Sequence, residues 1–312
     1  MEQVARYYRF SRYLKETYGC RVWKVCVDAG FTCPNIDGTI GESGCLYCNE
    51  RTFSYAKQRD TLPLEKQLER GIANLKAKGK ADKFIVYFQD HTNTHAPVDV
   101  LADAFSRVDE YEDIVSLAIG TRPDCMSAAV CEVIRERAEK YDVWIELGVQ
   151  SMHDETLKTI ERGHTYAAFL EAVEQLRAIR NVKICAHIIL GLPGESREMM
   201  MATAREMGRL EIDGIKIHPL HVVKGTGLAD WYENDAYTPL TMDAYIALAA
   251  EGLTYLAPKT VIQRITAECE EAYLIAPDWI QNKTHVLNTL SQYLEKHDLR
   301  QGMKWEGAQC SS

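Results

Sequence analysis

Short apolar runs alternate with helix-like stretches through the first two thirds of this 312-residue chain. Several of the runs are dense in β-branched residues, which is typical of strands buried on both faces. The expected strands are Val22–Val27, Lys83–Gln89, Ile114–Ile119, Val143–Val149, Val182–Leu190 and Gly214–His218. The expected helices lie near residues 64–78, 98–109, 127–140, 166–180 and 196–210. Six strands separated by helices predict an α/β fold in which a parallel sheet curls into a partial barrel.

The composition is that of an ordinary globular protein, with 46% hydrophobic and 26% charged residues. The N-terminal residues are charged and have no apolar secretory core, and no apolar run approaches the length of a membrane span. We therefore expect a cytoplasmic protein without a membrane segment. In that compartment, the ten cysteines are expected to be metal ligands, catalytic thiols or buried side chains rather than disulfides.

Three cysteines carry most of the chemical information. Eleven residues separate Cys33 from Cys45, and two residues separate Cys45 from Cys48. A cubane iron–sulfur cluster normally takes four thiolates, so three thiolates would leave one iron open to a substrate or cosubstrate. The three glycines between the first two cysteines permit the backbone turns that such a loop needs.

Two other readings of these cysteines remain open from their spacing alone. Structural zinc takes four ligands, and His91 or His95 is available as the fourth. A Cys-x-x-Cys pair is also typical of thioredoxin-like redox sites.

Polar or glycine-rich stretches follow five of the expected strands. They are the cysteine loop, Gln89–His95, Thr121–Asp124, Gly148–Ser151 and Gly191–Glu195. The carboxyl ends of parallel strands meet at one edge of a sheet, and ligands collect there in barrels and open sheets. The sequence therefore predicts an active site at this end of the barrel.

Five longer stretches together resemble one enzyme family. They are Cys33–Cys48, Tyr87–Pro97, Thr121–Cys125, Glu146–Ser151 with Arg162–His164, and His187–Gly194. The chain is similar, from about Arg9 to Gly302, to radical S-adenosylmethionine (SAM) enzymes of the Elp3-like group, in the branch typified by YhcC and YtqA. The resemblance implies a partial (β/α)6 TIM-like barrel of the radical SAM type at residues 21–220. A helical segment at 1–20 would precede it, and a C-terminal α/β extension at 221–312 would cap it.

The resemblance also implies the cofactors. Cys33, Cys45 and Cys48 would hold a [4Fe–4S] cluster, and SAM would chelate the fourth iron. One electron, from a reductant such as ferredoxin or flavodoxin, would cleave SAM to methionine and a 5′-deoxyadenosyl radical that removes hydrogen from the substrate. The protein itself would bind, orient and shield the reactants.

Roles for individual residues follow from the same resemblance. Tyr47 would pack near the adenine. Gln150 and Arg162 match the spacing of a Gln–Arg pair in related barrels, and Arg162 would pair with the SAM carboxylate, which a guanidinium matches well. Gln89 and Asp90 occupy the strand end that holds the methionine amine in relatives, although the glycines usual there are missing. For Arg162 the alternative is a helix-surface arginine.

The remaining SAM contacts are expected from the other strand ends. Thr121 lies at the end of the third strand. Relatives carry a carboxylate for the ribose where this chain has Gly120, and Glu146 could substitute for it or be a structural ion-pair partner. The backbone from Ile189 to Gly191 resembles the segment that receives adenine, with a plain buried strand as the alternative.

The family suggests a substrate as well. YtqA-type proteins are linked to modification of the wobble uridine of tRNA, where a carboxymethylaminomethyl side chain would be trimmed toward aminomethyl. Arg6–Lys15 interleaves aromatic and cationic residues that could bind RNA, or could form a helix lying on the barrel. A net charge of −9 counts against nucleic acid. The alternatives are a small metabolite or protein side chain as substrate, or a non-catalytic metal-binding protein.

Overall fold

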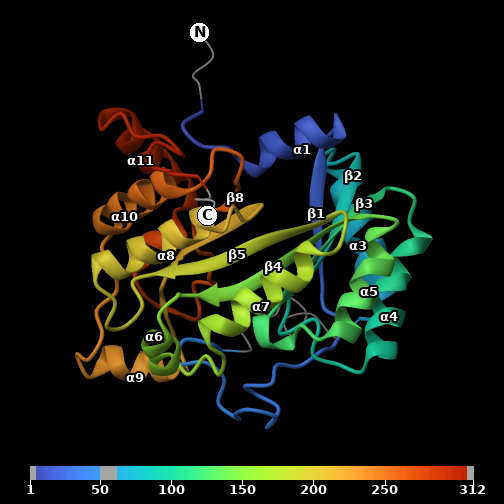
Figure 1. Cartoon of the computed structure of the whole chain (residues 1–312), viewed down its shortest axis with the longest axis horizontal. Helices are drawn as coiled ribbons and strands as arrows, with labels where there is room; N and C mark the ends of the chain where they lie inside the picture. The colour runs from blue at the N-terminus through green and yellow to red at the C-terminus, as the bar shows by residue number, and fades with distance from the viewer. Residues whose placement is uncertain (1–4, 50–61, 308–312) are drawn as a thin grey trace, which may run out of the picture.

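A curled parallel sheet forms the centre of the protein (Figure 1). The computed structural model describes residues 5–49 and 62–307. Within them, seven strands follow the order β1-β2-β3-β4-β5-β6-β8, and every neighbouring pair is parallel. The strands are β1 (Val22–Val27), β2 (Lys83–Phe88), β3 (Ile114–Thr121), β4 (Asp142–Gln150), β5 (Val182–Leu190), β6 (Gly214–Pro219) and β8 (Val261–Arg264). The expected α/β partial barrel is confirmed.

Amphipathic helices cover the outer face of this sheet. They are α3 (Leu64–Ala77), α4 (Val98–Ser106), α5 (Ala128–Ala138), α7 (Tyr166–Arg177) and α8 (Arg197–Arg209), with short 3₁₀ turns at Arg107–Glu110 and Pro123–Cys125. The main core lies between the helices and alternate strand residues such as Val143, Ile145, Leu147 and Val149. Because side chains alternate along a strand, every second residue of β4 from Trp144 onward, including Glu146 and Gly148, faces the inside of the barrel.

The seventh strand was not predicted. β8 comes from the C-terminal segment and pairs with β6, for example Gly214 with Val261. Its four residues are too few to give a periodic signal, and its pairing joins residues that are distant in sequence. The C-terminal segment therefore contributes a strand to the barrel and is more than a cap.

The rest of the C-terminal segment packs around α8 and the open end of the barrel. It contains α9 (Gly227–Glu233), α10 (Met242–Tyr255), α11 (Lys283–Lys296), a 3₁₀ turn at Asp278–Gln281, and the antiparallel pair β7 (Val222–Val223) and β9 (Leu274–Ala276). A side chain at Gly208 in α8 would meet the carbonyl of Tyr255, so only glycine allows α8 and α10 to approach this closely. No helix in the described ranges is long and apolar enough to cross a membrane.

Helix α1 (Phe10–Tyr18) closes the amino-terminal end of the barrel. Tyr13 packs edge-on against Trp144 at 5.5 Å between ring centroids, and Phe10 packs against the same indole at 6.4 Å. The backbone just before the helix also pairs with β8, where the Ile262 amide donates to the Tyr8 carbonyl. α1 and the cysteine loop therefore lie at opposite ends of the barrel (Figure 1).

Candidate functional site

The loop that carries the three cysteines is fixed at the carboxyl end of the strands. Its backbone turns locally, because the Ile36 amide donates to the Cys33 carbonyl at 2.8 Å. The Leu46 amide then donates to the Ile160 carbonyl at 3.0 Å, and the Leu46 carbonyl accepts from the Leu228 amide at 2.8 Å. The loop is thus hydrogen-bonded to the end of α6 (Asp154–Thr159) on one side and to the start of α9 on the other.

A small second core holds the segment between Cys45 and Cys48. Leu46 is buried with Leu157 and Ile160 beside α6 and with Leu228 of α9. A Cβ at Gly227 would lie 2.9 Å from Leu46 Cδ1, so any larger residue there would make the Leu46 side chain shift. The hydrophobic contact places Cys45 and Tyr47, on either side of Leu46, at fixed positions over the barrel.

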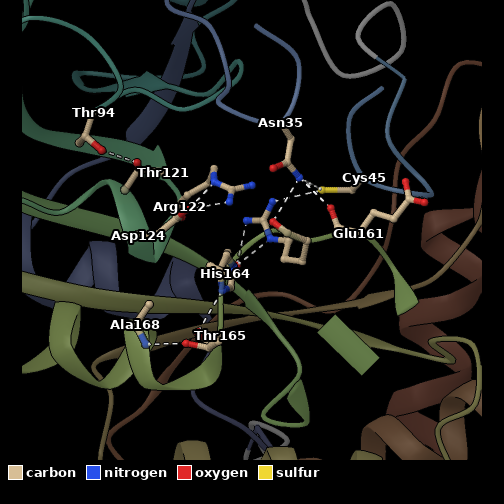
Figure 2. Close-up of polar contacts among 12 residues, drawn as sticks. Asn35, Cys45, Thr94, Thr121, Arg122, Asp124, Glu161, His164, Thr165 and Ala168 are labelled. Atoms are coloured by element: carbon tan, nitrogen blue, oxygen red, sulfur yellow. Dashed lines mark hydrogen bonds and ion pairs between the residues drawn. The ribbon is translucent and has the colours of Figure 1, made fainter. Parts of the chain in front are cut away.

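Two nitrogen donors converge on the sulfur of Cys45. Asn35 Nδ2 lies 3.3 Å from Cys45 Sγ, and Arg162 Nη1 lies 3.6 Å from it. Figure 2 shows Asn35 directed at the sulfur. Asn35 also donates to the carbonyls of Glu161 and Arg162, which joins the cysteine loop to the turn after α6. Nitrogen donors stabilise a thiolate, which is the form that binds iron.

Arg162 lies across the end of β4. Its Nη2 and Nε donate to the Gly148 carbonyl at 2.9 Å and 3.3 Å. A Cβ at Gly148 would be 2.5 Å from Arg162 Nη2 and 2.8 Å from Gln150 Nε2, so the absent side chain is what leaves room for both groups. Gln150 ends the strand with a φ of 64°, which turns the chain sharply there. Gln150 and Arg162 thus both lie next to Gly148, and their contact with SAM stays a prediction.

The charge of Arg162 persists although the side chain is buried. Burial disfavours the guanidinium, but the neighbouring Tyr47 and Cys45 outweigh it and raise the pKa of Arg162. His164, two residues further on, has both ring nitrogens within 3.2 Å of backbone carbonyls. Burial and the charge of Arg162 lower its pKa to about 4, so it is a neutral scaffold residue at physiological pH. A helix-surface position for Arg162 is excluded by its burial.

The end of β3 carries a second buried arginine. Arg122 is only 2% exposed and forms a bidentate pair with Asp124 at 3.0 Å and 2.8 Å. Thr121 shares a hydrogen bond of 2.5 Å with Thr94 from the loop after β2. Figure 2 shows both pairs at the same end of the barrel as Cys45.

The strand end of β2 is closed by an asparagine that sequence reasoning did not single out. Asn93 Nδ2 donates to the carbonyls of Phe88, Asp90 and Gly120, which ties the ends of β2 and β3 together. Gln89 is partly exposed next to this clamp, and Asp90 is buried under it. Their contact with a methionine amine stays a prediction.

Glu146 lies deeper in the barrel than the strand ends. Its carboxylate accepts from Lys24 Nζ at 2.8 Å and from Lys216 Nζ on the other oxygen. Burial alone would raise the pKa of Glu146, but the two ammonium groups outweigh it and hold the pKa below its ordinary value. These contacts match the ion-pair alternative, while its contact with a ribose stays a prediction.

The end of β5 is buried and held from above by the C-terminal segment. Ile189 belongs to the small second core. Gly191 has a φ of 86°, and its carbonyl accepts from the Tyr237 hydroxyl at 2.9 Å. The segment proposed for adenine therefore has a fixed backbone, at the same end of the barrel as the cysteine loop.

The N-terminal aromatic residues, by contrast, lie at the far end of the barrel. Tyr13 and Phe10 are used in packing on Trp144, and Arg12 pairs with Glu16 at 2.7 Å within α1. The helix lying on the barrel is thus the arrangement observed, and it is remote from the cysteines.

The residues at the carboxyl end fit a [4Fe–4S] cluster and SAM. Asn35 Oδ1, Arg122 Nη1 and Gln150 Oε1 are buried without a hydrogen-bond partner among the described residues, and all three belong to this end. Buried polar atoms are normally paired, so such a group of orphans is expected where a polar ligand binds. Three thiols on one loop suit a cluster, in which each thiolate binds a different iron.

In residues 5–49 and 62–307, no three His, Cys, Asp or Glu side chains gather closely enough to hold one metal ion. Thiolates on one zinc would lie roughly 4 Å from one another, given Zn–S bonds of about 2.3 Å in a tetrahedron.

Besides Asn93, the site residues that sequence reasoning left without a role are Asn35, Arg122 and His164. All three stand inside the stretches that carried the resemblance, beside a cysteine ligand or a strand end. Their positions were therefore available, but their contacts with Cys45, Asp124 and Gly148 join residues that are distant in sequence or depend on side-chain direction.

Comparison with known proteins agrees with this geometry. The chain matches the Radical SAM superfamily over residues 37–207 and the Radical_SAM C-terminal domain over residues 212–296. It is 38% identical over 297 residues to the protein YtqA of Bacillus subtilis, covering 95% of this chain and 92% of that one. It is 36% identical over 293 residues to YhcC of Escherichia coli, covering 93% of each.

More distant relatives are longer than this chain. It is 34% identical over 166 residues to a tRNA uridine(34) acetyltransferase of Dehalococcoides mccartyi, covering 52% of this chain and 35% of that protein. The solved structure of archaeal Elp3 from Methanocaldococcus infernus is 20% identical, with a TM-score of 0.68 over 90% of this chain and 64% of that one. The chain belongs to the radical SAM superfamily, whose cofactors are a [4Fe–4S] cluster and S-adenosylmethionine.

Proposed function

We propose that this protein cleaves SAM reductively and uses the product to remove a hydrogen atom from its substrate. Cys33, Cys45 and Cys48 would bind three irons of the cluster and leave the fourth for SAM. When bound, the cluster would supply one electron to SAM, so that the bond between sulfur and C5′ would break to give methionine and a 5′-deoxyadenosyl radical, which would take a hydrogen atom from the substrate and become 5′-deoxyadenosine.

The observation that carries the proposal is the pair of donors on Cys45 Sγ, set among buried polar atoms that have no partner in the described chain. Arg162 and Asn35 hold the Cys45 sulfur in place, and Arg162 keeps a positive charge beside it. A guanidinium at this position also suits the carboxylate of SAM. Gln150 Oε1 and Arg122 Nη1 are available as further ligands for polar groups.

The chain's own residues would also exclude water from the reacting atoms. Tyr47 lies between two cysteines, and burial beside Cys45 raises the pKa of its hydroxyl, so it stays a neutral aromatic. Ile189 lines the same end from β5, within the apolar cluster that supports the cysteine loop. Such walls would keep solvent away from a radical.

The experiment is the release of 5′-deoxyadenosine from SAM. Full-length protein is reconstituted anaerobically with iron and sulfide, reduced with dithionite, and the nucleoside is measured by chromatography. Release above that of the Cys45→Ala variant is expected. Protein that contains four irons per chain yet releases no more nucleoside than the variant, with or without tRNA, would contradict the proposal.

For the substrate, we propose the wobble uridine of tRNA. Support comes from the partial similarity to a protein named tRNA uridine(34) acetyltransferase. Deleting the gene should change the wobble-uridine nucleosides, measured by mass spectrometry of digested tRNA. Unchanged nucleosides would reject tRNA and favour a small metabolite or a protein side chain.

A further inference from the structure

A group of charged side chains on the inner face of the barrel lies outside the proposed SAM site. We call it the inner cluster: Lys24, Tyr87, Glu146, Lys216 and Gln263. Lys24 Nζ contacts Glu146 at 2.8 Å and Gln263 Oε1 at 3.1 Å, while Lys216 Nζ contacts the other oxygen of Glu146 and the Tyr87 hydroxyl at 3.0 Å. The five residues come from five of the seven strands, β1, β2, β4, β6 and β8, so the inner cluster forms only when the barrel folds.

The inner cluster has one more positive charge than negative. Two ammonium groups share the single carboxylate of Glu146, and nearby Arg264 pairs at 3.1 Å with Glu268, a carboxylate that Lys283 also contacts. Each ammonium has three N–H donors, and the contacts among the described residues account for two of them on Lys24 and two on Lys216. The third donor of each lysine has no oxygen acceptor among these contacts, although Lys24 also faces the rings of Phe10 and Tyr87 and Lys216 faces that of Tyr87.

Neutral imidazoles lie above the inner cluster. His187 and His218 have ring centroids 4.1 Å apart, and the Nε2 atom of each is buried without a partner in the described ranges. Burial lowers the pKa of His187 to about 3 and that of His218 well below its ordinary value, so neither ring cancels or adds charge. They offer uncharged polar contacts to whatever the lysines hold.

Solvent reaches this inner face. Cys26, two residues beyond Lys24 on the same face of β1, is exposed, and Lys24 and Tyr87 are partly exposed. The inner cluster is therefore not sealed like the core on the outer face of the sheet.

The position of the inner cluster relates it to the SAM site. Glu146 precedes Gly148 by two residues on the same face of β4, which places the two levels about 7 Å apart. Gly148 in turn holds Arg162, which contacts Cys45. A group bound to the lysines would thus lie one layer below the proposed site of SAM cleavage.

We propose that Lys24 and Lys216 bind a carboxylate of the substrate and so position it beneath SAM. This rests on the proposed function, because it identifies the chemistry of that same substrate. A singly charged carboxylate neutralises the excess charge of the inner cluster and accepts one N–H from each lysine. A phosphate monoester, which is a dianion, would leave the inner cluster with a net negative charge in a partly buried place, which is costly.

Alkylation of Cys26 tests this without SAM turnover. Reconstituted full-length protein is treated anaerobically with iodoacetate, a carboxylate, or with neutral iodoacetamide, and modification at Cys26 is located by peptide mass spectrometry. Cys20, in the loop after α1, is the internal reference that cancels the intrinsic difference between reagents. One excess charge near the thiol should raise the iodoacetate-to-iodoacetamide rate ratio at Cys26 about fivefold over that at Cys20.

Variants separate the lysines from general surface charge. Lys24→Met and Lys216→Met should each bring the ratio at Cys26 to that at Cys20, and Glu146→Gln should raise it. Lys296→Met, at an exposed position in α11, should leave it unchanged. Equal iodoacetate-to-iodoacetamide ratios at Cys26 and Cys20 in the protein without substitutions would overturn the proposal, and this outcome does not depend on whether each variant folds.

Competition then identifies the anion. Acetate at millimolar concentration should slow iodoacetamide modification of Cys26 more than inorganic phosphate does. Stronger protection by phosphate would overturn the assignment to a carboxylate. No step of this test requires SAM cleavage. Equal alkylation ratios together with normal 5′-deoxyadenosine release would reject only the carboxylate site. The expected ratios together with no 5′-deoxyadenosine release would reject only the radical chemistry.

Discussion

Replacing Gly148 with alanine perturbs the proposed SAM site without removing any polar group. Gly148 sits where β4 passes beneath Arg162, and its carbonyl accepts two hydrogen bonds from that guanidinium. An alanine Cβ would lie 2.5 Å from Arg162 Nη2 and 2.8 Å from Gln150 Nε2, closer than van der Waals contact allows. Arg162 must then move, and its contact with Cys45 moves with it.

The cost can be worked from these contacts. Overpacking by one methyl group in a tight site costs about 1–3 kcal/mol. A hydrogen bond to a charged group contributes about 1.5–3 kcal/mol, and part of that is lost when the guanidinium shifts. We expect Gly148→Ala to lower the free energy of unfolding by about 3 kcal/mol. If Arg162 also positions SAM, 5′-deoxyadenosine release should fall at least tenfold, equivalent to about 1.4 kcal/mol in the barrier.

The assay pairs urea unfolding of the apoprotein with 5′-deoxyadenosine release by the reconstituted enzyme. Gly252→Ala is the matched control, because an added Cβ there would lie 3.5 Å from the Ala204 side chain, an ordinary contact inside helix α10. It should leave release unchanged and unfolding unchanged or slightly improved. If Gly148→Ala behaved like this control in both measurements, the close approach of Arg162 to β4 would be irrelevant to stability and activity.

Three further predictions concern the ligands, the far end of the barrel and pH. Alanine at Cys33, Cys45 or Cys48 should abolish 5′-deoxyadenosine release, whereas Cys269→Ala should retain it. Equal loss of release in all four variants would contradict the assignment of the three cysteines as cluster ligands. Tyr13→Ala should lower the free energy of unfolding by about 3 kcal/mol, because its ring packs on Trp144, yet leave SAM cleavage intact; cleavage lost in protein that remains folded would contradict a purely structural role for α1. Burial lowers the pKa of His187 to about 3, so the unfolded chain binds a proton that the folded protein does not. Stability from this group is present above about pH 6.5 and should fall by about 2 kcal/mol between pH 7 and pH 5. Denaturant titrations of His187→Asn should show a shallower fall, and an unchanged pH dependence would exclude the residue as its source.

The fold could be predicted from sequence wherever the signal was local. Val182–Leu190 was expected as a buried strand and is observed with the same bounds, and helix α4 begins directly after Pro97, where a helix start was expected. β8 was not predicted because its four residues carry no periodicity and its partner β6 lies more than forty residues earlier in the chain. Local pattern determines strands and helices, while the edge of a sheet depends on non-local pairing.

The same distinction between local and non-local signals applies to the site. The cysteine spacing and the strand ends were visible in the sequence, so the location of the site was predictable. The burial of Arg162 was not, because it depends on an absent side chain at Gly148, fourteen residues away. Glu146 could be placed on the inner face by alternation alone, but its two lysine partners come from β1 and β6.

The most direct test of the central claim is electron paramagnetic resonance of the reduced cluster with and without SAM. The measurement uses anaerobically reconstituted protein with four irons per chain, reduced with dithionite. If three thiolates leave one iron open, SAM binds that iron, and the g values of the reduced cluster should change on its addition. An identical spectrum with saturating SAM would mean that the fourth iron is not available to SAM, and would contradict both the open iron and the reductive cleavage of SAM at this site.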